Sequence, residues 1–246
     1  MASHQLPVEF VERLQKIVPP EQFATVLFSF SQPDPIVIRV NALKPDAVSV
    51  AGQLTAEGLA LQEISWCPGA YIAAGWPKEK LSAHPLVING QVYFQNISSL
   101  IPALVLKPVP GDRILDLCAA PGSKTTQMSG LMNNQGEITA VEAVRPRFFR
   151  LHSVCGLLGA KNVKLVLTDG RRFRAHQLFD KILVDAPCSS EGRFKAGDPE
   201  SFGYWSTRKI KEMSQKQKGL LMNAGRLVKP GGDLVYSTCT LAPEEN

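Results

Sequence analysis

Short runs of apolar and β-branched residues alternate with longer, more polar segments over the second half of the chain. The runs predict strands at residues 113–119, 137–143, 163–169, 180–186 and 233–239, and the segments between them predict helices at residues 123–132, 145–159 and 207–228. Apolar strands separated by helices are typical of a parallel sheet that helices cover on both faces. This half of the chain is therefore expected to be an α/β domain with a doubly wound sheet.

The first ninety residues have a different pattern, in which helices come first and short strands follow. Apolar residues at close to helical spacing begin it, at Val8, Val11, Leu14 and Val18. The pattern predicts helices at residues 7–18, 20–30 and 46–58, the last capped by Asp46, and strands at 35–43, 59–65, 70–73, 86–88 and 91–94. A helix at 95–108 leads into the second half. We expect a small α+β domain over residues 1–90 and a second domain over residues 91–246.

The composition of the 246 residues, 44% apolar and 20% charged, is that of a soluble protein. No apolar run has the length of a membrane span, and the first residues lack the sections of a secretory signal, so we expect a cytoplasmic protein. The five cysteines are an odd number without a CxxC pair, which fits neither a disulfide framework nor a zinc ribbon. No metal site is expected.

The net charge of +5 favours a polyanionic partner such as nucleic acid, although it says nothing about the fold. Basic residues gather in three clusters, Arg145, Arg147 and Arg150, then Arg171, Arg172 and Arg174, then Lys209, Lys211, Lys216 and Lys218. For any single cluster a solvated helix face is the favoured interpretation.

The strand predicted at 113–119 runs into the loop DLCAAPGSKTT, residues 116–126. In an open parallel sheet, ligands bind at the carboxyl ends of the strands, and the small side chains of Ala119, Ala120 and Gly122 allow a ligand to approach the backbone. A phosphate-binding P-loop is excluded because Cys118 and Ser123 occupy its two glycine positions. The dinucleotide fingerprint GxGxxG is absent as well, which argues against a nicotinamide oxidoreductase.

Two acids follow the next two strands. Glu142 ends the second strand and is placed like an acid that pairs with a ribose diol. Asp169 ends the third and is placed to meet an adenine amino group, although a helix cap or a solvated loop is as good an interpretation for this residue alone. The loop and the two acids together describe an adenosine site that is not built for phosphates. S-adenosylmethionine is the common cofactor of that description.

Cysteines follow the last two strands, Cys188 in DAPCSS and Cys239 in STCT. Buried structural cysteines are the plain alternative, but turn residues flank both, and loops at strand ends commonly carry function. A thiolate that adds to carbon 6 of a pyrimidine makes carbon 5 nucleophilic enough to accept a methyl group, which splits one hard step into two. Asp185, an acid beside the ring, would stabilise such an adduct.

Three motifs, DLCAAPGSKT, DAPCSSEGRF and KPGGDLVYSTCTLAPEEN, resemble the signature motifs of the Sun-type RNA (cytosine-5) methyltransferase family. IRVNALK and the segment from Tyr93 to Asp116 also resemble it, so the likeness covers residues 35–246. It implies a Rossmann-like methyltransferase sheet and an enzyme that uses S-adenosylmethionine. Within the family, the sequence is most similar to bacterial ribosomal RNA small-subunit methyltransferase F-like members.

The resemblance also implies roles for single residues. Cys239 would attack carbon 6 and Cys188 would assist product release, while Asp185 and Lys124 would contact the cytosine. The residues implied to surround S-adenosylmethionine are Cys118, Ala119, Ala120, Pro121, Gly122, Ser123, Lys124, Glu142, Asp169 and Asp185.

The sequence departs from the family pattern at three places. Ser123 stands where glycine is common, and KAGDPESF is longer than the usual loop. The family continues through two further strands beyond PEEN, so the sequence is expected to be a truncated form that lacks its last strands. A fifth strand left uncovered beside Cys239 would be prone to aggregation.

The resemblance predicts methylation of cytosine in RNA, with ribosomal RNA favoured. An enzyme that acts on a base edge needs an unpaired or flipped base, so residues 1–90 and the basic clusters are the expected RNA surface, on a monomer. Phe202, Tyr204 and Trp205 offer stacking, although packing is the better interpretation for Trp205. The alternatives are a tRNA cytosine-5 methyltransferase and a non-catalytic RNA-binding or ribosome-assembly factor with this fold.

Overall fold

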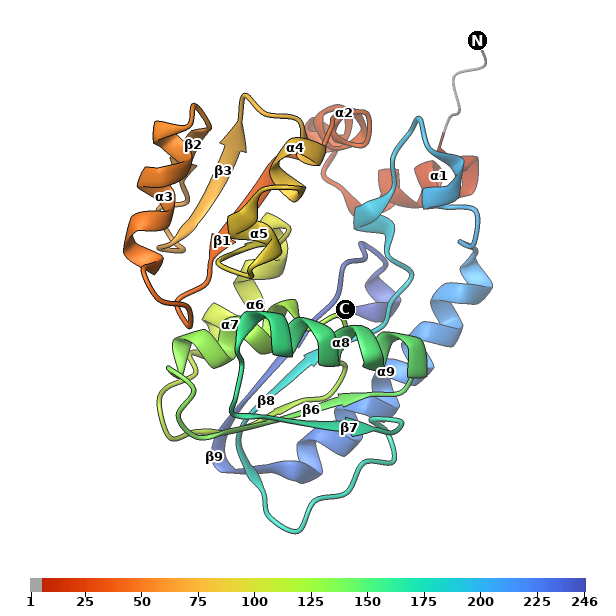
Figure 1. Ribbon diagram of the computed structural model, residues 1–246. Coiled ribbons are helices and arrows are strands. Elements are labelled where there is room, and N and C mark those ends of the chain that lie inside the picture. The colour runs from red at the N-terminus through yellow and green to blue at the C-terminus, as the bar shows by residue number, and fades with distance from the viewer. Residues whose placement is uncertain (1–5) are drawn as a thin grey trace. The chain divides into compact units, whose positions relative to one another are not determined.

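The structure, a computed structural model, describes residues 6–246 (Figure 1). Contacts divide the chain into two compact units, each built from segments that are separate in the sequence. One unit comprises the described residues up to Asp34 together with 186–221 and 237–246, and the other comprises 35–185 and 222–236. We call them the first and the second unit.

The second unit contains a five-stranded sheet in the order β7-β6-β5-β8-β9. Its strands are β5 (Arg113–Asp116), β6 (Glu137–Glu142), β7 (Val163–Leu167), β8 (Phe179–Asp185) and β9 (Val228–Ser237), the last of which ends in the first unit. The pairings β5–β6, β5–β8 and β6–β7 are parallel. The predicted doubly wound α/β fold is confirmed, and the strand order reverses at β5.

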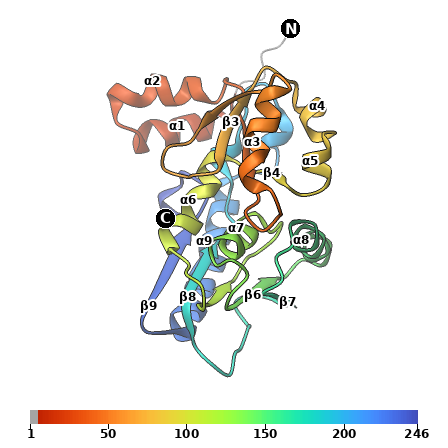
Figure 2. The same ribbon diagram turned by 60° about the vertical axis from the view of Figure 1, so that its left-hand side comes forward.

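Three helices lie along one face of this sheet, namely α6 (Ile101–Leu106), α7 (Ser123–Leu131) and α8 (Arg145–Leu158) (Figures 1 and 2). A short 3-10 turn, η1 (Ile97–Leu100), leads into α6. Side chains of α6 and α7 pack with those of β5, β6 and β8 in one buried cluster, which includes Ala103, Met128 and Ile138. Leu151 and Cys155 of α8 pack against Ala140 of β6 and against Ala119 and Ala120. The helices thus hold the loop after β5 as well as the sheet.

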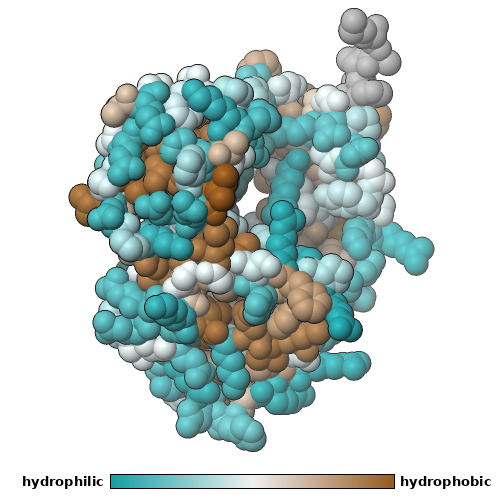
Figure 3. Space-filling view, viewed as in Figure 1, coloured by the Kyte–Doolittle hydropathy of each residue, from teal (hydrophilic) through white to brown (hydrophobic). Residues whose placement is uncertain are grey.

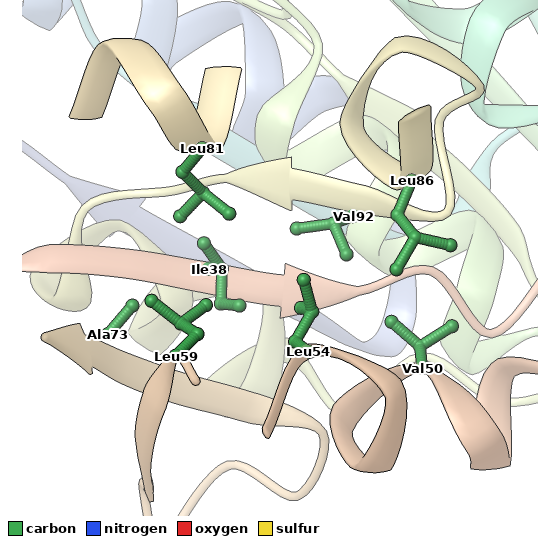
Figure 4. Close-up of a cluster of buried hydrophobic side chains, with 8 residues drawn as sticks. All are labelled: Ile38, Val50, Leu54, Leu59, Ala73, Leu81, Leu86 and Val92. Atoms are coloured by element: carbon green, nitrogen blue, oxygen red, sulfur yellow. The ribbon is translucent and has the colours of Figure 1, made fainter. Parts of the chain in front are cut away.

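A smaller, antiparallel sheet of the second unit has the order β2-β3-β1-β4. Its elements are β1 (Ile36–Val40), α3 (Ala47–Ala56), β2 (Ala60–Glu63), β3 (Ala70–Ala74), α4 (Lys78–Ser82), α5 (Pro85–Ile88) and β4 (Val92–Phe94). Figure 4 shows its core, where Ile38 of β1 lies among leucines that the three short helices contribute.

Two local predictions in this region are wrong. Residues 86–88, predicted as a strand, belong to helix α5, because Pro85 favours a helix start and the His84 ring caps it by accepting a hydrogen bond from the Leu86 N–H at 3.2 Å. Asp46 precedes α3 but makes no side-chain cap, since its backbone is left-handed, with φ 59°. Its carbonyl oxygen instead accepts hydrogen bonds from the backbone and side chain of Ser49.

The first unit is built around aromatic rings. Its elements are α1 (Val8–Ile17), α2 (Pro20–Ser29), the 3-10 turns η2 (Glu191–Arg193), η3 (Pro199–Ser201) and η4 (Pro243–Glu245), and most of α9 (Thr207–Leu227), whose end lies in the second unit. Phe10 of α1 lies 5.4 Å from Phe30 and 4.9 Å from Phe194 between ring centroids. Ring contacts at these separations stabilise beyond the area they bury.

Gly136, just before β6, tests how tightly the loops at the amino ends of the parallel strands are packed. Its φ is +91°, and an added Cβ would lie 2.4 Å from the Asp112 carbonyl oxygen. Gly136→Ala is expected to lower the free energy of unfolding by about 3 kcal/mol, the sum of backbone strain and steric overlap, in urea denaturation.

Gly58→Ala is the matched control, because Gly58 also has a positive φ, of +93°, but open space where the Cβ would lie. It should cost only the backbone strain, about 1 to 2 kcal/mol. Equal losses in the two variants would contradict the close packing at Gly136.

Candidate active site

The loop that follows β5 lies at the point where the strand order reverses, which is where open α/β sheets bind ligands. Ala119 and Ala120 are buried in it, and Gly122 has the left-handed φ of 108° that glycine adopts without strain. A Cβ at Gly122 would lie 3.0 Å from Leu151 of α8, so the loop backbone packs closely on that helix. Ser123 begins α7 without a positive φ, so its side chain causes no backbone strain there.

Asp116, the last residue of β5, is a site residue that the sequence analysis missed. It is 1% exposed, and its Oδ2 accepts a hydrogen bond of 2.7 Å from the Thr125 hydroxyl. Its Oδ1 is buried with no hydrogen-bond partner among the described residues. Burial raises the pKa of this carboxyl to about 7, against the hydrogen bond from Thr125. The loop therefore begins at an acid that is partly protonated near neutral pH.

Glu142 ends β6 as predicted, and its side chain is buried. Its Oε1 accepts a hydrogen bond of 2.8 Å from the Val144 N–H, and Arg147 Nη1 lies 3.6 Å from its Oε2. The same guanidinium donates to the Ala120 carbonyl oxygen at 2.7 Å. Arg147, expected only as part of a basic cluster, therefore links the acid to the loop.

Asp169 lies two residues after β7 and is engaged with Arg171. The guanidinium contacts both carboxylate oxygens, with Nη2 at 2.5 Å from Oδ2, and the Arg171 N–H donates to Oδ1 at 2.9 Å. These hydrogen bonds, mainly that of the side chain, lower the pKa of Asp169. An adenine amino group would have to share an acceptor that Arg171 already uses.

Lys124 and Asp185, the two residues implied to contact a base, lie together in the second unit. Lys124 Nζ is 2.7 Å from Asp185 Oδ2 and donates a second hydrogen bond of 2.9 Å to the Ser99 hydroxyl. The lysine side chain is 11% exposed and that of the aspartate 34%, so the pair is shielded on the lysine side. Ser99, which precedes α6, was not predicted.

Cys188 and Cys239 lie side by side in the first unit. Their sulfurs are 3.2 Å apart, the Cys239 N–H donates to Cys188 Sγ at 3.3 Å, and the Ser190 hydroxyl lies 3.5 Å from Cys239 Sγ and 3.8 Å from Cys188 Sγ. The hydrogen bond to Cys239, burial and the charge of Cys239 together raise the pKa of Cys188 far above its ordinary value. Cys188 therefore stays a thiol that can donate to its neighbour.

The other three cysteines also have raised pKa values, but from burial and, in the described part of the chain, without a cysteine neighbour in contact. Burial raises the pKa of Cys67, that of Cys118 and that of Cys155, the last to about 12. Among residues 6–246, no three histidine, cysteine or acidic side chains gather in a way that could hold a metal ion.

Aromatic and basic residues that were candidates for RNA contact are partly used inside the protein. Trp205 packs between Phe10 and Phe194, at 5.9 and 6.3 Å, and its indole donates to Glu191 at 2.8 Å, so it is a packing residue as expected. Lys209 and Lys216 pair with Glu212 along α9. Tyr204, by contrast, is 51% exposed.

Helix α8 presents apolar as well as basic side chains to solvent. Phe149 is 54% exposed and Leu157 is 43% exposed, and Figure 3 shows apolar surface over this helix. Arg145 lies over the Phe149 ring, 5.8 Å from its centroid.

In the described part of the chain no helix is both long and apolar enough to cross a membrane.

Comparison with known proteins gives two family matches along the chain. Residues 6–97 match the N-terminal domain of 16S rRNA methyltransferase RsmF, and residues 103–246 match 16S rRNA methyltransferase RsmB/F. Among solved structures, a methyltransferase homolog from Pyrococcus horikoshii is 30% identical with a TM-score of 0.86, over 98% of this chain and 76% of that one. NSun6 from Pyrococcus horikoshii with SFG is 25% identical with a TM-score of 0.87, over 99% and 85%.

Curated relatives carry the name ribosomal RNA small subunit methyltransferase F. Those of Vibrio campbellii and Vibrio cholerae are 37% and 38% identical to this chain over 98% of its length. The chain spans about half the length of these relatives, 52% in both. The two family matches follow one another along the chain, and the curated relatives are more than 30% identical to it. The chain therefore belongs to the 16S rRNA methyltransferase RsmB/F family, of the Sun type.

Proposed function

We propose that this protein transfers a methyl group from S-adenosylmethionine to carbon 5 of a cytosine in small-subunit ribosomal RNA, through a covalent adduct with Cys239. The observation that carries the proposal is the pair of cysteines with sulfurs 3.2 Å apart, where contact with Cys239 and burial raise the pKa of Cys188. Covalent pyrimidine chemistry needs one thiolate to attack and benefits from a proton donor beside it. The names of the relatives, ribosomal RNA small subunit methyltransferase F, support the choice of RNA.

The loop after β5 and the acids beyond it fit S-adenosylmethionine. Buried Ala119 and Ala120 keep the loop backbone free of large side chains. Asp116, just before this loop, has a buried Oδ1 without a hydrogen-bond partner among the described residues, so this atom can bind a ligand. Glu142, oriented by Val144 and Arg147, is suited to a ribose diol. The similar NSun6 structure with SFG, an S-adenosylmethionine analogue, supports this assignment.

Residues 118–124, Glu142, Asp169 and Asp185 would hold the cofactor. When bound, S-adenosylmethionine supplies a methyl group that is electrophilic because it is attached to a positively charged sulfonium. The site needs no group that binds phosphate for such a ligand, which agrees with Cys118 and Ser123 standing where a P-loop has glycines.

The protein residues divide the chemistry of the base among themselves. The Cys239 thiolate adds to carbon 6, which makes carbon 5 nucleophilic. Once carbon 5 is methylated, its proton passes to solvent water and the electrons of that C–H bond expel the Cys239 sulfur, which restores the ring and the thiolate. Lys124 fixes the Asp185 carboxylate at 2.7 Å, so that it can accept a hydrogen bond from the base. Cys188, as a thiol, assists the departure of Cys239 from the product.

The RNA would be bound by the basic surface of a monomer in the cytoplasm. We assign RNA binding to a domain of residues 1–90 and to the basic clusters of the sequence. Methyl transfer is assigned to residues 91–246. Because the target atom lies within stacked bases, the cytosine must be unpaired or flipped out. Bisulfite sequencing of ribosomal and transfer RNA, from cells with and without the gene, would identify the RNA; a site lost in tRNA alone would contradict the ribosomal assignment.

The nucleophile is tested by Cys239→Ala. Without the thiolate, carbon 5 is not activated, and methyl transfer to RNA should fall by at least about a thousandfold. Calorimetry should still show binding of S-adenosylmethionine and none of a nicotinamide dinucleotide.

Cys67→Ala is the matched control for the loss of a thiol, since Cys67 is buried in the small α+β part of the second unit. It should retain activity. Undiminished methyl transfer by Cys239→Ala would refute the assignment of the nucleophile.

The release role is tested by Cys188→Ala. If Cys188 assists the departure of Cys239, this variant should accumulate a protein–RNA adduct that survives denaturing electrophoresis, whereas Cys188→Ala combined with Cys239→Ala should form none. Rapid turnover by the single variant without any adduct would contradict the proposed role.

A further inference from the structure

Two buried carboxylates join the two cysteine loops of the first unit, and no step of the chemistry above uses them. Glu191 follows Cys188 in SSEGRF and is 2% exposed, and Glu245 follows Cys239 in PEEN and is 3% exposed. We propose that Glu191 and Glu245 form a reciprocal clamp, in which each acid binds the loop of the opposite cysteine and so fixes the distance between the sulfurs. The inference rests on the proposed function, for which it names the positioning residues.

Glu191 holds the chain immediately after Cys239. Its Oε2 accepts hydrogen bonds from the Thr240 hydroxyl at 3.0 Å and from the Leu241 N–H at 3.1 Å. Its Oε1 accepts from the Trp205 indole at 2.8 Å, which ties the acid to the aromatic core. The neighbouring Gly192 N–H donates to the Cys239 carbonyl oxygen at 2.9 Å.

Glu245 holds the chain immediately after Cys188 in the same manner. Its Oε2 accepts from the Ser189 N–H at 3.0 Å and from the Gln217 amide at 2.8 Å. Gln217 in turn donates to the Pro187 carbonyl oxygen at 2.9 Å, on the other side of Cys188. Between the two acids the hydroxyls of Ser189 and Thr240 lie 2.6 Å apart. The residues on both sides of Cys188 are therefore anchored to the segment that carries Cys239.

The burial of these acids argues for fixed geometry. A carboxylate removed from water is costly unless donors satisfy it, so Glu191 and Glu245 are stable only where the opposite loop presents its N–H and O–H groups. Hydrogen bonds to ionised acceptors are also short and directional. A loop that moved away would leave a buried charge uncompensated, and this penalty holds the two cysteine loops in one arrangement.

Glu191 is a positioning residue and is not suited to be a general base. Both of its oxygens already accept hydrogen bonds from protein donors, and its side chain is buried under Trp205 and Thr240. A group that removes the carbon 5 proton has to reach the substrate within hydrogen-bond distance. The acid acts on the reaction through the position of Cys239.

The clamp is tested by Glu191→Gln, with disulfide formation as a measure of sulfur proximity that needs neither RNA nor cofactor. Diamide removes two protons and two electrons from the thiols and is reduced to the hydrazine, so a disulfide between Cys188 and Cys239 can form only while they are close. In glutamine, an NH₂ group replaces one carboxylate oxygen and cannot accept the hydrogen bonds that this oxygen of Glu191 accepts. We expect cross-linking, quantified by mass spectrometry of tryptic peptides, to slow by about tenfold or more, because displacements near 1 Å have effects of that size.

The same variant should lower kcat for methyl transfer by about tenfold or more, while KM for S-adenosylmethionine changes little. Leu14→Ala is the matched control, since Leu14 is fully buried in the aromatic core and its apolar side chain makes no hydrogen bond to either cysteine loop. It should lower the melting temperature at least as much, with cross-linking and kcat unchanged. If Glu191→Gln does not fold, Thr240→Val carries the test, because it removes one hydroxyl donor and conserves the shape of the side chain.

Three results would overturn the clamp: unchanged cross-linking in Glu191→Gln or Thr240→Val, no cross-link in the unaltered protein, or losses in Leu14→Ala equal to those of the clamp variants. A protein that shows no methyl transfer, yet whose cross-linking depends on Glu191, would refute the proposed function and support the clamp. The two claims therefore fail separately.

Discussion

Parallel pairing of β5 with both β6 and β8 is the constraint on which the rest of the structure depends. It brings the carboxyl ends of the three strands to one edge, so that Asp116, Glu142 and Asp185 end neighbouring strands. Helices that leave this edge pack back on the sheet. The close approach of α8 and a φ of +108° both favour glycine at position 122. The loop can then present its backbone to a ligand, because Ala119 and Ala120 are buried in the protein.

Environment gives similar side chains different chemical properties. Asp116 ends one strand of the sheet and Asp169 follows another, yet burial raises the pKa of Asp116 to about 7 and the Arg171 guanidinium lowers that of Asp169. The five cysteines separate in the same way. Burial raises the pKa of three of them, whereas the pKa of Cys188 is raised first by its contact with the sulfur of Cys239.

Periodicity and chain order were sufficient to predict the features that are local in sequence or imposed by the sheet. The strands around Asp116, Glu142 and Asp185 were predicted because runs of buried apolar residues precede these acids. Contacts that depend on helix rotation and loop folding were not predictable: Arg147 reaches Ala120, Lys124 reaches Ser99, and Glu191 reaches Leu241 across 50 residues. Residues 86–88 were misassigned because a single proline turned an apolar run into a short helix.

The proposed division of roles between Cys188 and Cys239 agrees with the electrostatics of two sulfurs 3.2 Å apart. Two thiolates at that distance would repel each other in a partly buried site, so one proton stays with the pair over a wide range of pH. The pKa of Cys188 is raised, which favours keeping that proton on Cys188, and its thiol lies close enough to donate a hydrogen bond to the Cys239 sulfur. In the proposed reaction, the negative charge of Cys239 disappears when its sulfur bonds to carbon, and the Cys188 thiol then loses its acceptor. As the proposed carbon–sulfur bond breaks, charge returns to Cys239 and the hydrogen bond forms again, so the same contact would stabilise the attacking group and favour its release.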